Sequence, residues 1–203
     1  YKINDLSEKF IYFNDDMFLI KKSSPKEWFI NNKVVLSGNW AKTYNIQPLK
    51  KISNMIKHVF KIRPSYNAAQ SRSANIAGFK RKYFRSYHSG RPQIKSIIKS
   101  FYEKNPNMLK KQLKHKFRND KQYMPYSLCW HLLIKEERYV KVSKSKLVEI
   151  EKIRNYTPHK LKEILGELDN NEEVKLLNIQ DLNYASEDTS MVFKNWFFNK
   201  LTN

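Results

Sequence analysis

Cysteine, glycine and proline are scarce in this 203-residue chain, which contains one Cys, four Gly and seven Pro. A single cysteine excludes a disulfide framework and a zinc site built from cysteines. The few glycines and prolines exclude collagen-like and low-complexity chains. No apolar run approaches the roughly 20 residues that span a bilayer. A P-loop and a GxGxxG fingerprint are also absent, so neither of these common phosphate-binding loops is available.

Acidic residues are outnumbered, because 19 Asp and Glu stand against 39 Lys and Arg and the net charge is +20. Hydrophobic residues make up 40% of the chain and aromatic residues 14%, enough for one well-packed domain with or without a small appendage. A surface of this charge attracts nucleic acid, phospholipid headgroups, nucleotides or polyanionic polymers. The positive net charge alone does not distinguish among these partners. Each basic run, at 50–51, 80–82 and 110–116, is equally well explained as solvated surface.

The residue pattern predicts a mixed architecture. Short apolar runs predict strands at 10–13, 33–37, 139–142, 146–150 and 174–179, and helical spacing with capping residues predicts helices from about 47 and at 65–79, 92–102, 106–113, 126–137, 158–166 and 187–201. The chain thus divides into a strand-rich segment (1–45), a helical segment (46–137) and a segment of strands and a C-terminal helix (138–203). We expect an α/β fold, a Rossmann-like mixed or parallel sheet with a largely helical insertion or lobe. The strands that end at Asn14 and Ile179 should share that sheet.

Two predicted strands end in acidic or amide residues. Asn14, Asp15 and Asp16 follow the first strand, and Gln180 and Asp181 follow the last. Ligands of open α/β sheets bind beyond the carboxyl ends of strands, where carboxylates can hold a divalent cation and, through it, a diphosphate. An ordinary turn at 14–16 and a solvated loop at 181 explain the same residues, and spacing alone favours that explanation.

Three further residues have chemistry of their own. His88 precedes the helix predicted at 92–102, a place where an anion can bind and where a histidine can act as a general base. Arg118 ends a basic helix, and a guanidinium can bind phosphate through two parallel hydrogen bonds. Taken singly, each residue is better explained as an ordinary one, an exposed loop histidine and a helix-end arginine. Cys129 lies on an apolar helical face and is expected in the core rather than as a nucleophile.

Three segments, in this order, resemble one known family. The string FIYFNDDMF at 10–18 is similar to the "FlYlNDDvf" signature in the second conserved region of Stealth proteins, the bacterial capsule-polysaccharide hexose-1-phosphate transferases. These are related to the eukaryotic phosphotransferase that builds the mannose-6-phosphate tag. The stretch from His88 to the KFR string at 116–118 resembles the third region. The LNIQD string at 177–181, with the aromatic helix after it, resembles the fourth. The resemblance covers most of the chain.

The chain also departs from the family pattern. Ser89, Gly90 and Arg91 stand between His88 and Pro92, where the family has a proline close to its histidine, and Gln180 stands where asparagine is usual. The family's first region and its closing "KSsFE" element are missing. We therefore expect residues 1–203 to be the C-terminal part of a single catalytic domain, inactive or incomplete on its own.

The resemblance implies a reaction. A UDP-sugar, commonly a UDP-N-acetylhexosamine, would give its sugar-1-phosphate to an acceptor hydroxyl on a growing polysaccharide, forming a phosphodiester and releasing UMP. His88, Asp15, Asp16 and Arg118 would be catalytic, with His88 as the base. Arg118, Arg91 and Asn14 would bind the donor, and Mg²⁺ or Mn²⁺ would sit on Asp15, Asp16 and Asp181. The enzyme would be cytoplasmic, with peripheral contact at the anionic inner face of the plasma membrane.

Two other functions fit parts of the sequence. A nucleic-acid-binding module without catalytic activity would explain the net charge of +20 and the 14% aromatic content. No RNP-like, zinc-finger or helix-turn-helix signature supports it, so no nucleic-acid partner is expected. A non-catalytic relative that only binds polymer or lipid is the other alternative.

Overall fold

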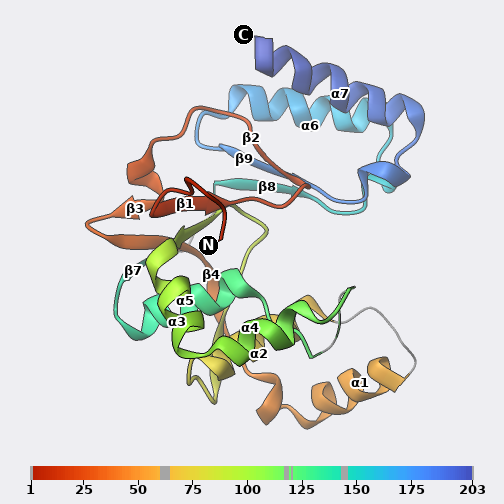
Figure 1. Cartoon of the computed structure of the whole chain (residues 1–203). Coiled ribbons are helices and arrows are strands. Elements are labelled where there is room, and N and C mark those ends of the chain that lie inside the picture. The colour runs from red at the N-terminus through yellow and green to blue at the C-terminus, as the bar shows by residue number, and fades with distance from the viewer. Residues whose placement is uncertain (1, 60–64, 117–118, 120, 143–145, 203) are drawn as a thin grey trace. The chain divides into compact units, whose positions relative to one another are not determined.

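The computed structural model describes residues 2–59, 65–116, 119, 121–142 and 146–202 and shows a mixed α/β protein with several small sheets (Figure 1). The contact pattern divides the chain into two compact units. The first unit comprises residues 1–12, 26–87 and 91–143, and the second comprises residues 13–25, 88–90 and 144–203. Each unit is therefore assembled from segments that are far apart in the sequence.

Strand β4 (Lys33–Lys42) is the centre of the first unit's larger sheet. It pairs antiparallel with β3 (Phe29–Ile30) and β5 (Lys82–Ser86), and parallel with β7 (Tyr139–Val142). Gly38 allows β5 to approach closely, because a Cβ at this position would lie 2.3 Å from the carbonyl oxygen of Arg85. A separate antiparallel pair joins β1 (Lys9–Tyr12) to β6 (Arg91–Ile94).

The described part of the first unit also contains helices. They are α1 (Pro48–Val59), α2 (Tyr66–Ile76), α3 (Lys95–Lys104), α4 (Pro106–Leu113) and α5 (Pro125–Lys135), with the short 3-10 helices η1 (Pro25–Glu27) and η2 (Tyr44–Ile46) between strands and helices. Helix α5 supplies the middle of the core: Leu128, Cys129 and Leu133 are fully buried there and cluster with Val34, Leu36 and Phe84. The core position expected for Cys129 is confirmed.

The second unit is a three-stranded sheet covered by two helices. Strand β9 (Leu176–Ile179) lies between β2 (Met17–Leu19), to which it is antiparallel, and β8 (Leu147–Ile150), to which it is parallel. Helices α6 (Pro158–Asn170) and α7 (Glu187–Thr202) lie side by side on this sheet (Figure 1). The connections contain η3 (Ile153–Asn155) and η4 (Leu182–Tyr184). Leu161, Leu165, Leu177 and Phe193 share its core.

The expected mixed α/β class is confirmed, and two finer expectations are wrong. Residues 92–94 are not helical: they belong to β6, whose four residues are all buried against β1, and α3 begins only at Lys95. Burial on a strand partner overrides the helical spacing there. The strand before the Asn-Asp-Asp turn, β1, also does not share a sheet with β9; the strand after the turn, β2, does.

His131 is a buried polar group whose hydrogen bonds are satisfied inside the first unit. Its Nε2 accepts the backbone N–H of Phe84 at 2.9 Å, and its Nδ1 lies 2.6 Å from the carbonyl oxygen of Ser127, to which it donates. This arrangement suits the neutral ring, and burial lowers the pKa of His131 from 6.5 to about 4.

His131 should make the fold sensitive to acid. Between pH 6.5 and pH 4 the unfolded chain binds a proton on this ring that the folded chain excludes. Stability is therefore full above pH 6.5 and falls as the pH drops toward 4, by about 3 kcal/mol from this group. We expect His131→Gln, which keeps an acceptor for Phe84, to flatten this part of a urea-denaturation pH series. The exposed His159→Gln is the control, and equal slopes for His131→Gln and the wild type would contradict the assignment.

Candidate functional site

The two acidic strand ends lie at one edge of the second unit's sheet. Because β2 runs antiparallel to β9, its first residue pairs with the carboxyl end of β9, and Met17 lies opposite Asn178. The backbone N–H of Ile179 donates to the carbonyl oxygen of Asp16 at 2.9 Å. The Asn-Asp-Asp turn and Gln180 with Asp181 therefore meet at this edge.

The three predicted metal ligands differ in their surroundings. Asp15 and Asp181 are exposed, and Asp181 adopts a left-handed conformation (φ 63°) at the start of η4. Asp16 is half-buried, and its Oδ1 is buried without a hydrogen-bond partner within the described part of the chain. Among the residues that the structure describes, no group of three His, Cys, Asp or Glu side chains is arranged to hold a metal ion. A buried carboxylate oxygen on a turn with further oxygen donors nevertheless suits a hard cation that keeps several of its waters.

His88 is held at the same sheet by a carboxylate. It lies in the loop after β5, and its Nδ1 is 2.5 Å from Oε1 of Glu149 on β8. The Nδ1 atom is also 2.9 Å from Nε2 of Gln180. A carboxylate only accepts hydrogen bonds, so the contact with Glu149 places the proton on Nδ1 and leaves the basic lone pair on Nε2. In this tautomer the Gln180 amide nitrogen is a close neighbour of Nδ1 and does not donate to it. A histidine oriented in this way is equipped to take a proton from a hydroxyl group.

A chain of amide hydrogen bonds links this histidine to the Asn-Asp-Asp turn. Gln180 Nε2 donates to Asn178 Oδ1 at 3.2 Å and lies 3.4 Å from Glu149 Oε1. Asn178, fully buried within β9, donates from Nδ2 to the carbonyl oxygen of Asp16 at 2.9 Å. The side-chain amide of Asn178 thus has a partner at both its oxygen and its nitrogen, which removes the cost of burying it and fixes its orientation.

Glu149 and Asn178 were not predicted as site residues. Glu149 is the acidic residue near the carboxyl end of a third strand, the same signal that drew attention to the other two strand ends. Asn178 is the polar residue inside the apolar run of β9. A buried amide in such a run indicates a specific hydrogen-bonded partner, and this signal was available in the sequence.

Arg91 occupies a different environment, in the first unit. Its side chain is fully buried, and its NH2 group donates to the hydroxyl of Tyr66 at 2.6 Å. The guanidinium carbon lies 4.2 Å from the ring centre of Tyr126 and 5.7 Å from that of Tyr12, so tyrosines surround the cation. Burial raises the pKa of the Tyr126 hydroxyl, which keeps that ring neutral. Arg118, the other predicted donor-binding arginine, lies outside the described residues.

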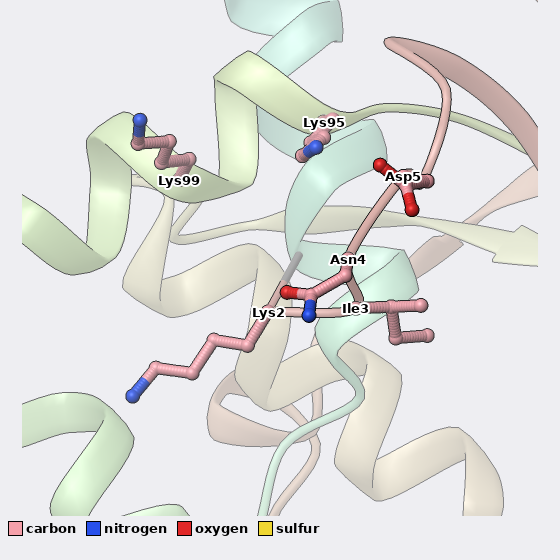
Figure 2. Close-up of a pocket in the computed structure, with 6 residues that line it drawn as sticks. All are labelled: Lys2, Ile3, Asn4, Asp5, Lys95 and Lys99. Carbon is pink, nitrogen blue, oxygen red and sulfur yellow. The ribbon is translucent and has the colours of Figure 1, made fainter.

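A hollow of about 450 Å³ lies near the N-terminus of the first unit and is drawn in Figure 2. Its lining includes three lysines, Lys2, Lys95 and Lys99. Two of them already have oxygen partners: Lys95 donates to the carbonyl oxygen of Leu6 at 2.9 Å, and Lys99 pairs with Glu103 at 3.8 Å. The hollow therefore lacks the converging, pre-oriented groups found around His88.

The comparisons with known proteins give one short similarity. No family model matches the chain. A segment of 32 residues is 59% identical to a capsular polysaccharide phosphotransferase of Neisseria meningitidis serogroup B. This match covers 16% of the chain and 9% of that relative's length. It agrees with a relationship to sugar phosphotransferases of capsule synthesis. Separately, the described helices include none long and apolar enough to cross a membrane.

We expect Glu149 to set the tautomer of His88. In Glu149→Leu the acceptor for the Nδ1 proton is gone, so the proton should move toward Nε2, whereas Glu149→Gln keeps an acceptor oxygen and should preserve the wild-type tautomer in part. Two-bond ¹H–¹⁵N NMR correlations of the ring report the proton position directly. The exposed Glu151→Leu is the matched control on the same segment. An unchanged ring spectrum in Glu149→Leu would contradict this role.

Proposed function

We propose that the chain is catalytic machinery of a Stealth-type transferase that moves a sugar-1-phosphate from a UDP-sugar to an acceptor hydroxyl during capsule polysaccharide synthesis. The observation that carries the proposal is His88 held by Glu149 at the sheet edge where the Asn-Asp-Asp turn begins. The short similarity to a capsular polysaccharide phosphotransferase supports it independently. A UDP-N-acetylhexosamine is the proposed donor and the growing polysaccharide the acceptor.

In the proposed reaction, Nε2 of His88 removes the proton of the acceptor hydroxyl. The acceptor oxygen forms a bond to the phosphorus that carries the sugar, and the bond from this phosphorus to the bridging oxygen breaks, so that UMP leaves. Glu149 stabilises the positive charge that the ring gains when it takes the proton. Gln180 and Asn178 hold the carboxylate and the turn in place during this transfer, which is how positioning lowers the barrier.

We further propose that Mg²⁺ or Mn²⁺ binds at the Asn-Asp-Asp turn. Asp16 would be the principal ligand because its buried Oδ1 has no hydrogen-bond partner in the described chain, with Asp15 and Asp181 as further oxygen donors. A bound cation of this kind would offset the negative charge of the donor's diphosphate. Asn14 and Arg118 keep their proposed roles toward the donor, and the net charge of +20 favours its approach. Arg91 is given no role in this proposal, because its side chain is fully buried among tyrosines in the first unit.

His88→Ala tests the base. General base catalysis commonly contributes about 100- to 10,000-fold, so we expect a loss of transfer in this range, measured as UMP release by the complete gene product. Donor binding by titration calorimetry should change little, because the base acts on the acceptor. His159→Ala, on the exposed surface of α6, is the control. An active His88→Ala enzyme would place the base elsewhere and overturn the mechanism.

Asp16→Asn tests the cation. The variant should bind Mn²⁺ at least about tenfold more weakly in a titration followed by electron paramagnetic resonance, because a ligand charge is lost. Its thermal stability should be unchanged or higher, because a buried carboxylate oxygen without a partner is removed. Asp188→Asn, at the exposed start of α7, should behave as the wild type. Equal Mn²⁺ binding by the wild type and Asp16→Asn would exclude the proposed site.

A further inference from the structure

Helix α1 leaves an apolar stripe in solvent. Leu49 is 82% exposed, Ile52 51% and Ile56 49%, and their spacing of three and four residues places them on one face of the helix. Ile46, in η2 just before the helix, is also exposed. Single exposed apolar residues are ordinary on protein surfaces, but a continuous helical stripe of them marks a surface that binds something.

The base of this helix is fixed within the first unit. The backbone N–H of Tyr44 in η2 donates to the hydroxyl of Ser71 on α2 at 3.0 Å, and Gln47 donates to the carbonyl oxygen of Thr43 at 3.1 Å. The helix therefore follows directly from a segment that is hydrogen-bonded to α2.

Charge around the stripe is of one sign. Residues 44–59 include Lys50, Lys51 and Lys57 and no Asp or Glu. Lys50 is exposed, and its ammonium lies 5.4 Å from the ring centre of Tyr44. Helix α7 also exposes apolar residues, but its first turn is acidic. Among the described helices, only α1 combines an exposed aliphatic stripe with a sequence that contains lysines and no acidic residue.

We propose that α1 lies on the surface of a membrane rich in anionic phospholipid. The side chains of Leu49, Ile52 and Ile56 would enter the boundary between headgroups and acyl chains, and Lys50 would contact the phosphates. A lipid surface fits better than a protein groove for two reasons. The stripe is purely aliphatic and lacks the Trp, Tyr and Arg anchors typical of protein interfaces, and its uniform positive charge matches a uniformly anionic surface. The proposal goes beyond the transferase function and does not depend on it.

Vesicle co-sedimentation of the 203-residue chain tests this. The wild type should bind vesicles of equal parts phosphatidylglycerol and phosphatidylcholine, bind pure phosphatidylcholine weakly, and be released by salt. Leu49→Glu combined with Ile52→Glu should weaken binding about tenfold or more, because the inserted apolar area is lost. Lys50→Glu should weaken it at least about fivefold. Met191→Glu on α7 and Lys162→Glu on α6 place the same charges elsewhere and should bind as the wild type.

The fold of each variant is checked at Cys129. Burial raises the pKa of this thiol to about 12, so it should stay unreactive toward a thiol reagent in every folded variant. Three outcomes would overturn the proposal: no binding of the wild type to anionic vesicles, equal binding by the α1 variants, or equal loss in the controls. RNA binding or self-association that depends on Leu49 and Ile52, without vesicle binding, would assign the stripe to a different partner. None of these outcomes bears on sugar-phosphate transfer, which is measured separately.

Discussion

The pairing of β2 with β9 is the contact on which the candidate site depends. It joins residues 17–19 to residues 176–178, so most of the chain lies between two strands that are neighbours in one sheet. Closing such a long loop costs chain entropy, and the apolar core beneath the sheet offsets it, with Leu177, Ile179 and Phe193 packed together. Without this pairing the carbonyl oxygen of Asp16 would lose its hydrogen bonds from Ile179 and Asn178, and the Asn-Asp-Asp turn would be an ordinary surface turn.

Burying a polar side chain at this edge costs little stability, because the buried amide there is hydrogen-bonded. Asn178 is fully buried in the middle strand, where an unsatisfied amide would be costly, and it bonds both to the turn and to Gln180. Glu149 and His88 remain about one-third exposed at the end of this chain of bonds. The arrangement thus has a buried part, Asn178, that holds the turn and Gln180 in place, and a solvent-accessible part, His88 and Glu149, that a substrate can reach.

The sequence predicted those features that depend on local pattern or on short apolar runs. Thr157 and Pro158 start α6 as expected, and Thr157 accepts the N–H of Lys160, because capping is a local interaction. The run at 174–179 is a buried strand for the same reason. The sequence did not predict which strands pair with one another. Residues 92–94 have helical spacing, yet they form a strand because they pair with β1. Likewise, the strand beside β9 is determined by contacts between residues more than 150 positions apart.

For the site, residue types were easier to predict than their connections. Asp16 and Gln180 were selected by their place after apolar runs and His88 by its place before a predicted helix. The contact from His88 to Glu149 spans 61 residues and leaves no local pattern in the sequence. Helix α1 shows the converse. Its local pattern is a strongly amphipathic helix, yet among the described residues Leu49, Ile52 and Ile56 are exposed and are not packed into a core. Natural sequences generally make local pattern and global burial agree, and the disagreement at α1 is the physical reason for proposing that its apolar face contacts a membrane.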